Sequence, residues 1–75
     1  MMTRWEYLTV QTGFFGLNNN KIGPQFVNGQ ELKDWKKVSL PQFLNQLGTD
    51  GWEMSSTLSV WSGTSTYLFF KRPGS

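Results

Sequence analysis

A single segment of this 75-residue chain has the sequence pattern of an α-helix. The lack of a second such segment constrains the fold more than any other feature. Residues 39–48, SLPQFLNQLG, begin with Ser39 as a candidate N-cap and place Gln42 three residues later, as in a capping box. Apolar residues recur at helical spacing and form one stripe: Leu40, Phe43, Leu44 and Leu47. A helix this short is marginal on its own, so we predict that its stripe packs on a β-sheet.

The other periodic segments have the composition of β-strands. Residues 5–12, 52–61 and 66–72 are rich in β-branched and aromatic residues, which predicts three strands, and residues 52–61 also alternate in polarity. Residues 5–12 carry apolar side chains on both faces, so their core face stays open. In residues 52–61 we assign the core face to one alternating set: Trp52, Met54, Ser56, Leu58 and Val60.

Glycine and asparagine mark the turns between these segments. Asn28-Gly29 predicts a β-hairpin with a type I′ turn, which needs positive φ at both residues. Residues 62–65, SGTS, predict a second hairpin turn. For residues 13–25 two interpretations stay open: an irregular hairpin around Asn18–Asn20, or a flexible loop whose aromatic side chains tuck back.

Together these elements predict a single α+β domain over residues 1–75. One short helix would pack on a small antiparallel sheet of three to five strands, in two layers. The chain offers no second helix to cover the other face of that sheet. In the last strand Tyr67 and Phe69 alternate with Leu68 and Phe70, so one of these two pairs should lie on the uncovered face.

The step from helix to strand is predicted to be a structural corner of the fold. Gly48 follows the last apolar position of the stripe, where a left-handed C′ residue is favoured. Gly51 fits the reversal of the chain, and Trp52 would close the end of the core. Substituting Trp52 with alanine should therefore destabilise the fold by about 3–5 kcal/mol.

The composition argues against an enzyme. The chain has no histidine and no cysteine, so it lacks the usual neutral-pH acid–base group, the commonest metal ligand and a thiolate nucleophile. The best catalytic arrangement left is a carboxylate pair, Glu6 and Glu53, if their strands are neighbours and the two groups share a proton. Salt bridges from these carboxylates to basic residues across the sheet are the favoured alternative. We therefore expect no catalytic activity, no cofactor and no bound metal.

Aromatic residues make up 16% of the chain, which is more than a thin single-layer core needs. The candidate interaction surface comprises Trp35, Trp61, Tyr67, Phe69 and Lys71. Because association usually covers an exposed apolar patch on so small a domain, we expect a homo-oligomer or a protein partner. Pairing of edge strands between subunits is a second route to association. Binding of a small ligand at the subunit interface is a further alternative.

Binding of single-stranded RNA or DNA is the other alternative. Aromatic side chains on an open sheet could stack bases, with a basic rim formed by Lys36, Lys37, Lys71 and Arg72. The formal charge of +2 is low for a dedicated nucleic-acid binder, and the order of elements differs from that of RNA-recognition domains, so this function is not favoured. Trp35 fits either such an aromatic platform or, as we favour, a loop whose indole packs on the domain edge.

No apolar run approaches the roughly 20 residues of a membrane span. The first residues also lack the basic-then-apolar order of a signal peptide. With no cysteine available for disulfides, we expect a soluble cytoplasmic protein without a membrane partner.

Three blocks of the sequence carry a resemblance to a known family: WEY at 5–7, LNQLGTDGWE at 44–53 and YLFFKRP at 67–73. Together they resemble domain-of-unknown-function family 4177, small bacterial domains that are common in cyanobacteria among others. The middle of the chain, 13–38, is longer than in the shortest members. The resemblance implies a compact α+β fold and implies no activity. It leaves the following motif positions without assigned roles: Trp5, Glu6, Tyr7, Gly48, Gly51, Trp52, Glu53 and Lys71.

Overall fold

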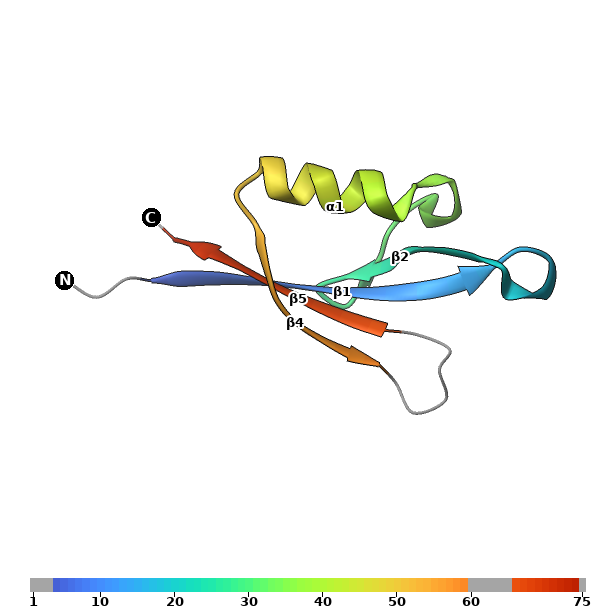
Figure 1. Cartoon of the computed structure of the whole chain (residues 1–75), viewed down its shortest axis with the longest axis horizontal. Coiled ribbons are helices and arrows are strands. Elements are labelled where there is room, and N and C mark those ends of the chain that lie inside the picture. Colours follow the sequence, from blue (N-terminus) through green and yellow to red (C-terminus); the bar gives the residue numbers. More distant parts are fainter. Residues whose placement is uncertain (1–3, 60–65, 75) are drawn as a thin grey trace.

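The computed structural model describes residues 4–59 and 66–74. In that part of the chain, five strands form one antiparallel sheet in the order β3-β2-β1-β5-β4. One α-helix, α1 (Leu40–Thr49), covers one face of this sheet, so the predicted two-layer α+β class is confirmed (Figure 1). Val60 and the predicted turn at 62–65 lie outside the described residues. The strands are β1 (Trp5–Phe15), β2 (Lys21–Val27), β3 (Gln30–Glu31), β4 (Glu53–Ser59) and β5 (Thr66–Pro73).

The apolar stripe of α1 packs on the sheet as predicted. Leu47 is buried, and Phe43 and Leu44 lie against the same core. Val10 and Phe70 are 0% and 3% exposed, so burial is nearly complete at the centre of this contact. The central strands β1 and β5 supply the sheet side of the core: Leu8, Val10, Leu68 and Phe70.

This packing settles which face of β1 belongs to the core. Val10 pairs with Leu68 and Leu8 pairs with Phe70, and all four side chains face α1. Side chains alternate along a strand, so the residues between them point away from the helix. These outward residues are Trp5, Tyr7, Thr9, Tyr67 and Phe69. We call this uncovered side of the sheet the outer face.

The end of α1 corrects the prediction for Gly48. Gly48 is helical, and the left-handed residue is Gly51, with φ of 91°. The N–H of Gly51 donates to the Gly48 carbonyl (3.0 Å), and the N–H of Trp52 donates to the Leu47 carbonyl (2.9 Å). This pair of bonds defines a Schellman cap. Trp52 packs against the core that contains Leu47, so the cap directs the chain from the helix into β4.

A β-bulge in β4 changes the predicted faces of that strand. Its pairing register with β5 shifts between Met54 and Ser56, so Ser55 is an extra residue. The extra residue moves all later side chains to the opposite face. Ser56 and Leu58 therefore lie on the outer face, and their predicted places in the core are wrong. Leu58 pairs with Tyr67 there and is 57% exposed.

Residues 13–25 form the irregular hairpin, and the alternative of a flexible loop is wrong. β1 continues to Phe15, and β2 returns antiparallel beside it. Between them lies a short 3-10 turn, η1 (Leu17–Asn19). Asn18 has φ of 59° at this tip, a conformation that asparagine tolerates better than most residues.

The predicted Asn28-Gly29 hairpin is confirmed between β2 and the two-residue strand β3. Asn28 and Gly29 have φ of 51° and 82°, both positive as a type I′ turn requires. Asn28 also binds β1, because its side-chain oxygen accepts a hydrogen bond from the N–H of Thr9 (2.9 Å). Its own N–H donates to the Thr9 carbonyl (2.8 Å), so the turn is held against the central sheet.

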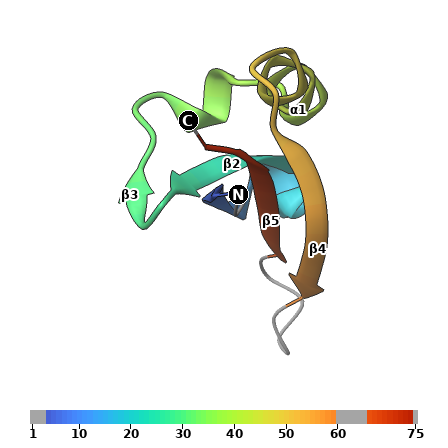
Figure 2. The same ribbon diagram turned by 90° about the vertical axis from the view of Figure 1, so that its left-hand side faces the viewer.

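The segment between β3 and α1 buries Trp35. It lies on the same side of the sheet as the helix (Figure 2) and contains a second 3-10 turn, η2 (Trp35–Lys37). Trp35 is 9% exposed and meets Phe15 edge to face, with 5.3 Å between ring centroids. A Cβ at Gly23 would lie 2.8 Å from the Trp35 carbonyl oxygen, so glycine permits this close approach. Trp35 packs on the domain edge as favoured, and its place on the candidate interaction surface is wrong.

The two glycines at the end of α1 should respond to alanine in opposite directions. Gly48→Ala puts a Cβ on a helical residue with nothing within 4 Å, so the free energy of unfolding should rise by about 0.5–1 kcal/mol. Gly51→Ala must hold a positive φ, so the free energy of unfolding should fall by roughly 1–2 kcal/mol. Urea unfolding followed by tryptophan fluorescence measures both changes. A stabilised Gly51→Ala protein would contradict the Schellman cap.

Truncation of two tryptophans should have unequal costs. Trp35→Ala empties a buried site, so it should lower the free energy of unfolding by about 3–5 kcal/mol. Trp52 is only half-buried, so Trp52→Ala should cost less than Trp35→Ala, below the range expected from the sequence alone. Urea or thermal unfolding of the two variants side by side gives the order. A larger loss at Trp52 would show that the helix end, not the Trp35 segment, limits stability.

Candidate interaction surface

The outer face presents side chains in rows that run across the sheet. Directly paired residues of antiparallel strands point to the same side, so the pairing register defines these rows. The first row takes one residue from each strand: Glu31, Phe26, Gln11, Tyr67 and Leu58. The second row comprises Thr9, Phe69 and Ser56. The third row comprises Tyr7, Lys71 and Glu53.

Apolar side chains run along the middle of this face. The rings of Tyr67 and Phe69 lie nearly parallel, with 6.4 Å between centroids and 13° between planes. Tyr7 is 70% exposed and Leu58 is 57% exposed. No other segment of residues 4–59 and 66–74 lies over them (Figures 1 and 2), so the sheet presents an apolar strip to solvent.

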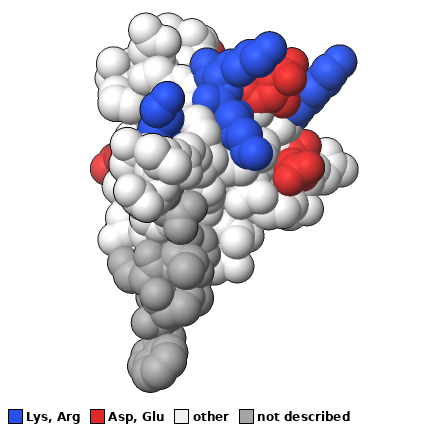
Figure 3. Space-filling view, turned by 90° about the vertical axis from the view of Figure 1, so that its right-hand side faces the viewer, with Lys and Arg blue, Asp and Glu red and all other residues white. Residues whose placement is uncertain are grey.

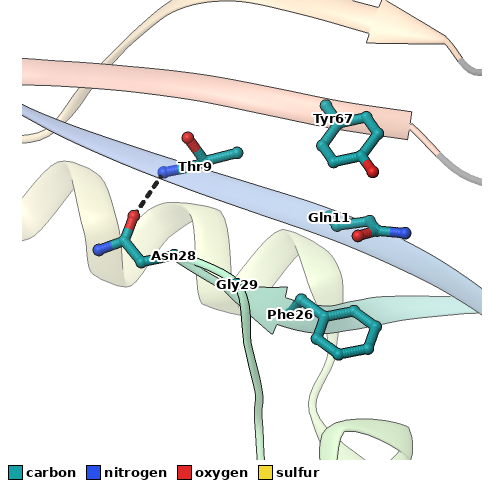
Figure 4. A pocket seen from close by; sticks show the side chains of 6 residues that line it. All are labelled: Thr9, Gln11, Phe26, Asn28, Gly29 and Tyr67. Carbon is teal, nitrogen blue, oxygen red and sulfur yellow. Dashed lines mark hydrogen bonds between the residues drawn. The ribbon is translucent and has the colours of Figure 1, made fainter.

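The first row contains a hollow of about 480 Å³. Phe26 and Tyr67 stand on either side of Gln11, with α1 behind the sheet (Figure 4). The hollow therefore has aromatic walls and a polar floor, and it opens on the outer face. Its lining residues are Thr9, Gln11, Phe26, Asn28, Gly29 and Tyr67.

The charges of the outer face are few and of both signs. Lys71 pairs with Glu53 across neighbouring strands. The Nζ atom of Lys71 lies 4.7 Å from the centroid of the Trp5 ring, which is a cation–π contact. Glu31 is the remaining charged residue of the three rows. The rows therefore hold one basic and two acidic side chains, which is not the basic rim predicted for nucleic-acid binding.

The other predicted rim residues lie away from the outer face. Arg72 pairs with Glu6 on the side of the sheet that faces α1. Lys36 and Lys37 belong to η2 and, together with Lys21, line a separate hollow of about 360 Å³. Where basic side chains gather on the surface in Figure 3, acidic side chains lie beside them. Basic residues and outer-face aromatics are thus largely separated in space.

Arg72 joins three elements at the corner that contains Trp52. Its guanidinium carbon lies 4.2 Å from the centroid of the Trp52 ring. One terminal nitrogen donates to the Asp50 carbonyl (2.8 Å), and the other lies 3.4 Å from the Glu6 carboxylate. The end of α1, β5 and β1 are therefore tied together beside Gly51.

The predicted carboxylate pair does not form. The strands that carry Glu6 and Glu53 are separated by β5. Glu6 lies on the helix side with Arg72, whereas Glu53 lies on the outer face with Lys71. Two carboxylates on opposite sides of a sheet cannot share a proton, so this catalytic candidate is wrong.

Acidic side chains within 4–59 and 66–74 do not gather in groups of three or more that could hold a metal ion. Over the same residues, the helix present is too short and too polar to cross a membrane.

Several outer-face residues escape prediction from the sequence. Tyr7 is missed because both faces of its strand are apolar, and Leu58 is missed because the bulge is invisible in a single strand. A buried residue, Thr12, is missed as well: its hydroxyl accepts from the Thr66 N–H (2.9 Å) and donates to the Thr66 carbonyl (3.2 Å). Of the predicted surface residues, Tyr67, Phe69 and Lys71 lie on the outer face, and Trp61 lies outside the described residues.

A scan against protein-family models and searches of curated proteins and of solved structures found no match to this chain. The resemblance to domain-of-unknown-function family 4177 therefore stays a prediction.

The contacts of Arg72 predict an order of effects at the corner. Arg72→Ala removes a cation–π contact worth roughly 0.5–1 kcal/mol and a charged hydrogen bond, so unfolding free energy should fall by about 1–2 kcal/mol. Glu6→Gln should cost less, because a half-exposed ion pair contributes about 0–1 kcal/mol. Urea unfolding of both variants tests this order. Equal losses would mean that the ion pair, and not the contact with Trp52, holds the corner.

Proposed function

We propose that this chain is a non-enzymatic self-association module that pairs through its outer face with the outer face of a second copy. The observation that carries the proposal is the uncovered apolar strip on one side of the sheet. Tyr7 and Leu58 are its exposed members, and Phe26, Tyr67 and Phe69 are half-buried beside them. Exposed apolar patches on small soluble proteins usually mark a surface that binds another molecule.

The thin core supports association. In a domain below about 70–80 residues, a single core rarely contributes more than about 3–5 kcal/mol of stability. Here α1 buries one side of the sheet, and the chain has no cysteine that could add a disulfide. A second copy on the outer face would bury the other side as well. Binding that requires the folded state also stabilises that state by mass action.

The outer face is small for such a contact. With residues about 3.4 Å apart, it extends about 20 Å along β1 from Trp5 to Gln11. With strands about 4.8 Å apart, it spans about 20 Å across the sheet in the first row and about 10 Å in the other two rows. A contact of this size lies at the small end of the range for protein interfaces, so the dimer should depend on concentration.

The charge of the outer face also favours a second copy over a nucleic acid. Its rows hold Lys71 beside Glu53, so two such faces can meet without repulsion between like charges. A phosphate backbone would instead meet Glu31 and Glu53 on this face with one lysine to compensate. The lysines of η2 border a different hollow.

Two further parts of the proposal come from the sequence. We place the module in the cytoplasm, because a chain without cysteine gains nothing from an oxidising compartment. We also retain kinship with domain-of-unknown-function family 4177 on the blocks at 5–7, 44–53 and 67–73.

A pair of leucine substitutions tests the proposal. Wild-type chain should have the mass of a dimer by light scattering after gel filtration, across a concentration series. Leu58→Glu puts an unpaired charge into the apolar strip, so the dimer should weaken by at least about tenfold. Leu17→Glu is the matched control, because Leu17 is 82% exposed on η1 and should leave the dimer unchanged.

Each alternative gives a different result. A wild-type monomer at every concentration would overturn the proposal. A dimer that Leu58→Glu leaves intact would remove the outer face from the interface and point to another contact. A monomer that binds single-stranded RNA with salt-dependent affinity would favour the nucleic-acid alternative.

A further inference from the structure

We propose that Tyr7 of each copy inserts into the hollow of the other copy, between Phe26 and Tyr67. This inference rests on the proposed function, because it names the contact through which the two outer faces dock. Tyr7 is 70% exposed, more than Trp5 or Leu58 on the same face. It stands in the third row, and the hollow lies in the first row. A protrusion and a recess therefore occupy the same face, two rows apart.

The spacing of the rows makes this contact mutual. Tyr7, Thr9 and Gln11 follow one another on the outer side of β1, roughly 7 Å apart. Consider a two-fold axis that lies between the two outer faces, passes over Thr9 and runs perpendicular to the strands. This axis places the first row of each copy over the third row of the other. Tyr7 of each copy then lies over Gln11 of the other. Thr9 and Phe69 meet their own counterparts at the axis, as an isologous interface requires.

The other simple arrangement packs less well. A two-fold axis along β1 would place Tyr7 against Tyr7 and one hollow against the other. Each hollow measures about 480 Å³, so their aromatic walls would face a void without packing partners. With the axis across the strands, each hollow is filled by an aromatic ring. The shape of the face therefore selects the arrangement that exchanges the rows.

The lining of the hollow suits a tyrosine. Phe26 and Tyr67 provide aromatic contacts for the ring of the incoming side chain (Figure 4). The side-chain amides of Gln11 and Asn28 offer hydrogen-bonding groups for its hydroxyl. The same exchange of rows brings Lys71 of one copy over Tyr67 of the other, a cation–π contact like that of Lys71 with Trp5.

Site-directed cross-linking tests this docking, because the chain contains no cysteine of its own. Packed sheets lie about 10 Å apart, so a short bismaleimide is the appropriate reagent and a direct disulfide is not. Thr9→Cys should cross-link to a dimer, since residue 9 lies on the axis. Gln11→Cys alone, which keeps Tyr7, should not cross-link, because the two copies of residue 11 lie at opposite ends of the contact. A mixture of Tyr7→Cys and Gln11→Cys chains, which keeps one Tyr7 in each mixed dimer, should cross-link. Leu17→Cys is the control and should remain a monomer on a denaturing gel.

A second measurement addresses the tyrosine itself. Tyr7→Ala should weaken the wild-type dimer by more than about 30-fold, as expected for a central aromatic anchor. Tyr7→Phe should weaken it less, because the ring is retained. Tyr7 is 70% exposed, so both variants should keep the circular dichroism spectrum of the wild type, and at concentrations where all chains are monomeric they should keep its unfolding midpoint.

The outcomes separate this docking from the broader proposal. A wild-type chain that stays monomeric overturns both. Suppose instead that the wild type is a dimer, and Thr9→Cys does not cross-link, Gln11→Cys cross-links to itself, or Tyr7→Ala dimerises as tightly as the wild type. In each of these cases self-association stands, and the insertion of Tyr7 is overturned.

Discussion

Between α1 and the sheet, Leu47 meets Val10, Leu68 and Phe70, and most other features of the structure follow from this contact. Residues 4–59 and 66–74 contain one α-helix, so only one side of the sheet is buried in this way. The alternation of side chains then sends the intervening residues of β1 and β5 to the opposite side. The packing that stabilises the fold therefore also creates the exposed strip, since Tyr67 and Phe69 occupy the positions between the buried residues of the same strand.

Features whose physics is local could be predicted from the sequence. The cap at Ser39, the apolar stripe of α1 and the Asn28-Gly29 turn each depend on residues a few positions apart, and all three are present. Pairing between distant strands could not be predicted in this way. The bulge at Ser55 exists only in the register of β4 with β5, and it moves Leu58 from the expected core to the outer face. Trp35 is buried because Gly23, distant in sequence, leaves room for it.

The two sides of the sheet have different chemistry: the helix side is closed by internal contacts, and the outer face carries uncovered aromatic side chains. The helix side holds the corner where Arg72 contacts Trp52 and Glu6, and each of these contacts is internal. The outer face carries aromatic side chains that no other described segment covers (Figures 1 and 2). The hydrogen bonds between Thr12 and Thr66 hold β1 and β5 together at the end of their pairing. They thereby keep the neighbouring residues Gln11 and Tyr67 side by side, and with them the hollow.

The bulge at Ser55 also affects how far assembly can proceed. β4 is an edge strand, and a regular edge strand can template the addition of one chain after another. A bulge bends its strand and increases the local twist, so a flat incoming strand could match β4 over only part of its length. Contact through a face related by a two-fold axis is saturated by two molecules, whereas edge-to-edge growth has no natural end. The single extra residue that exposes Leu58 therefore also disfavours growth of fibres through this edge, which is compatible with the closed pair that we propose.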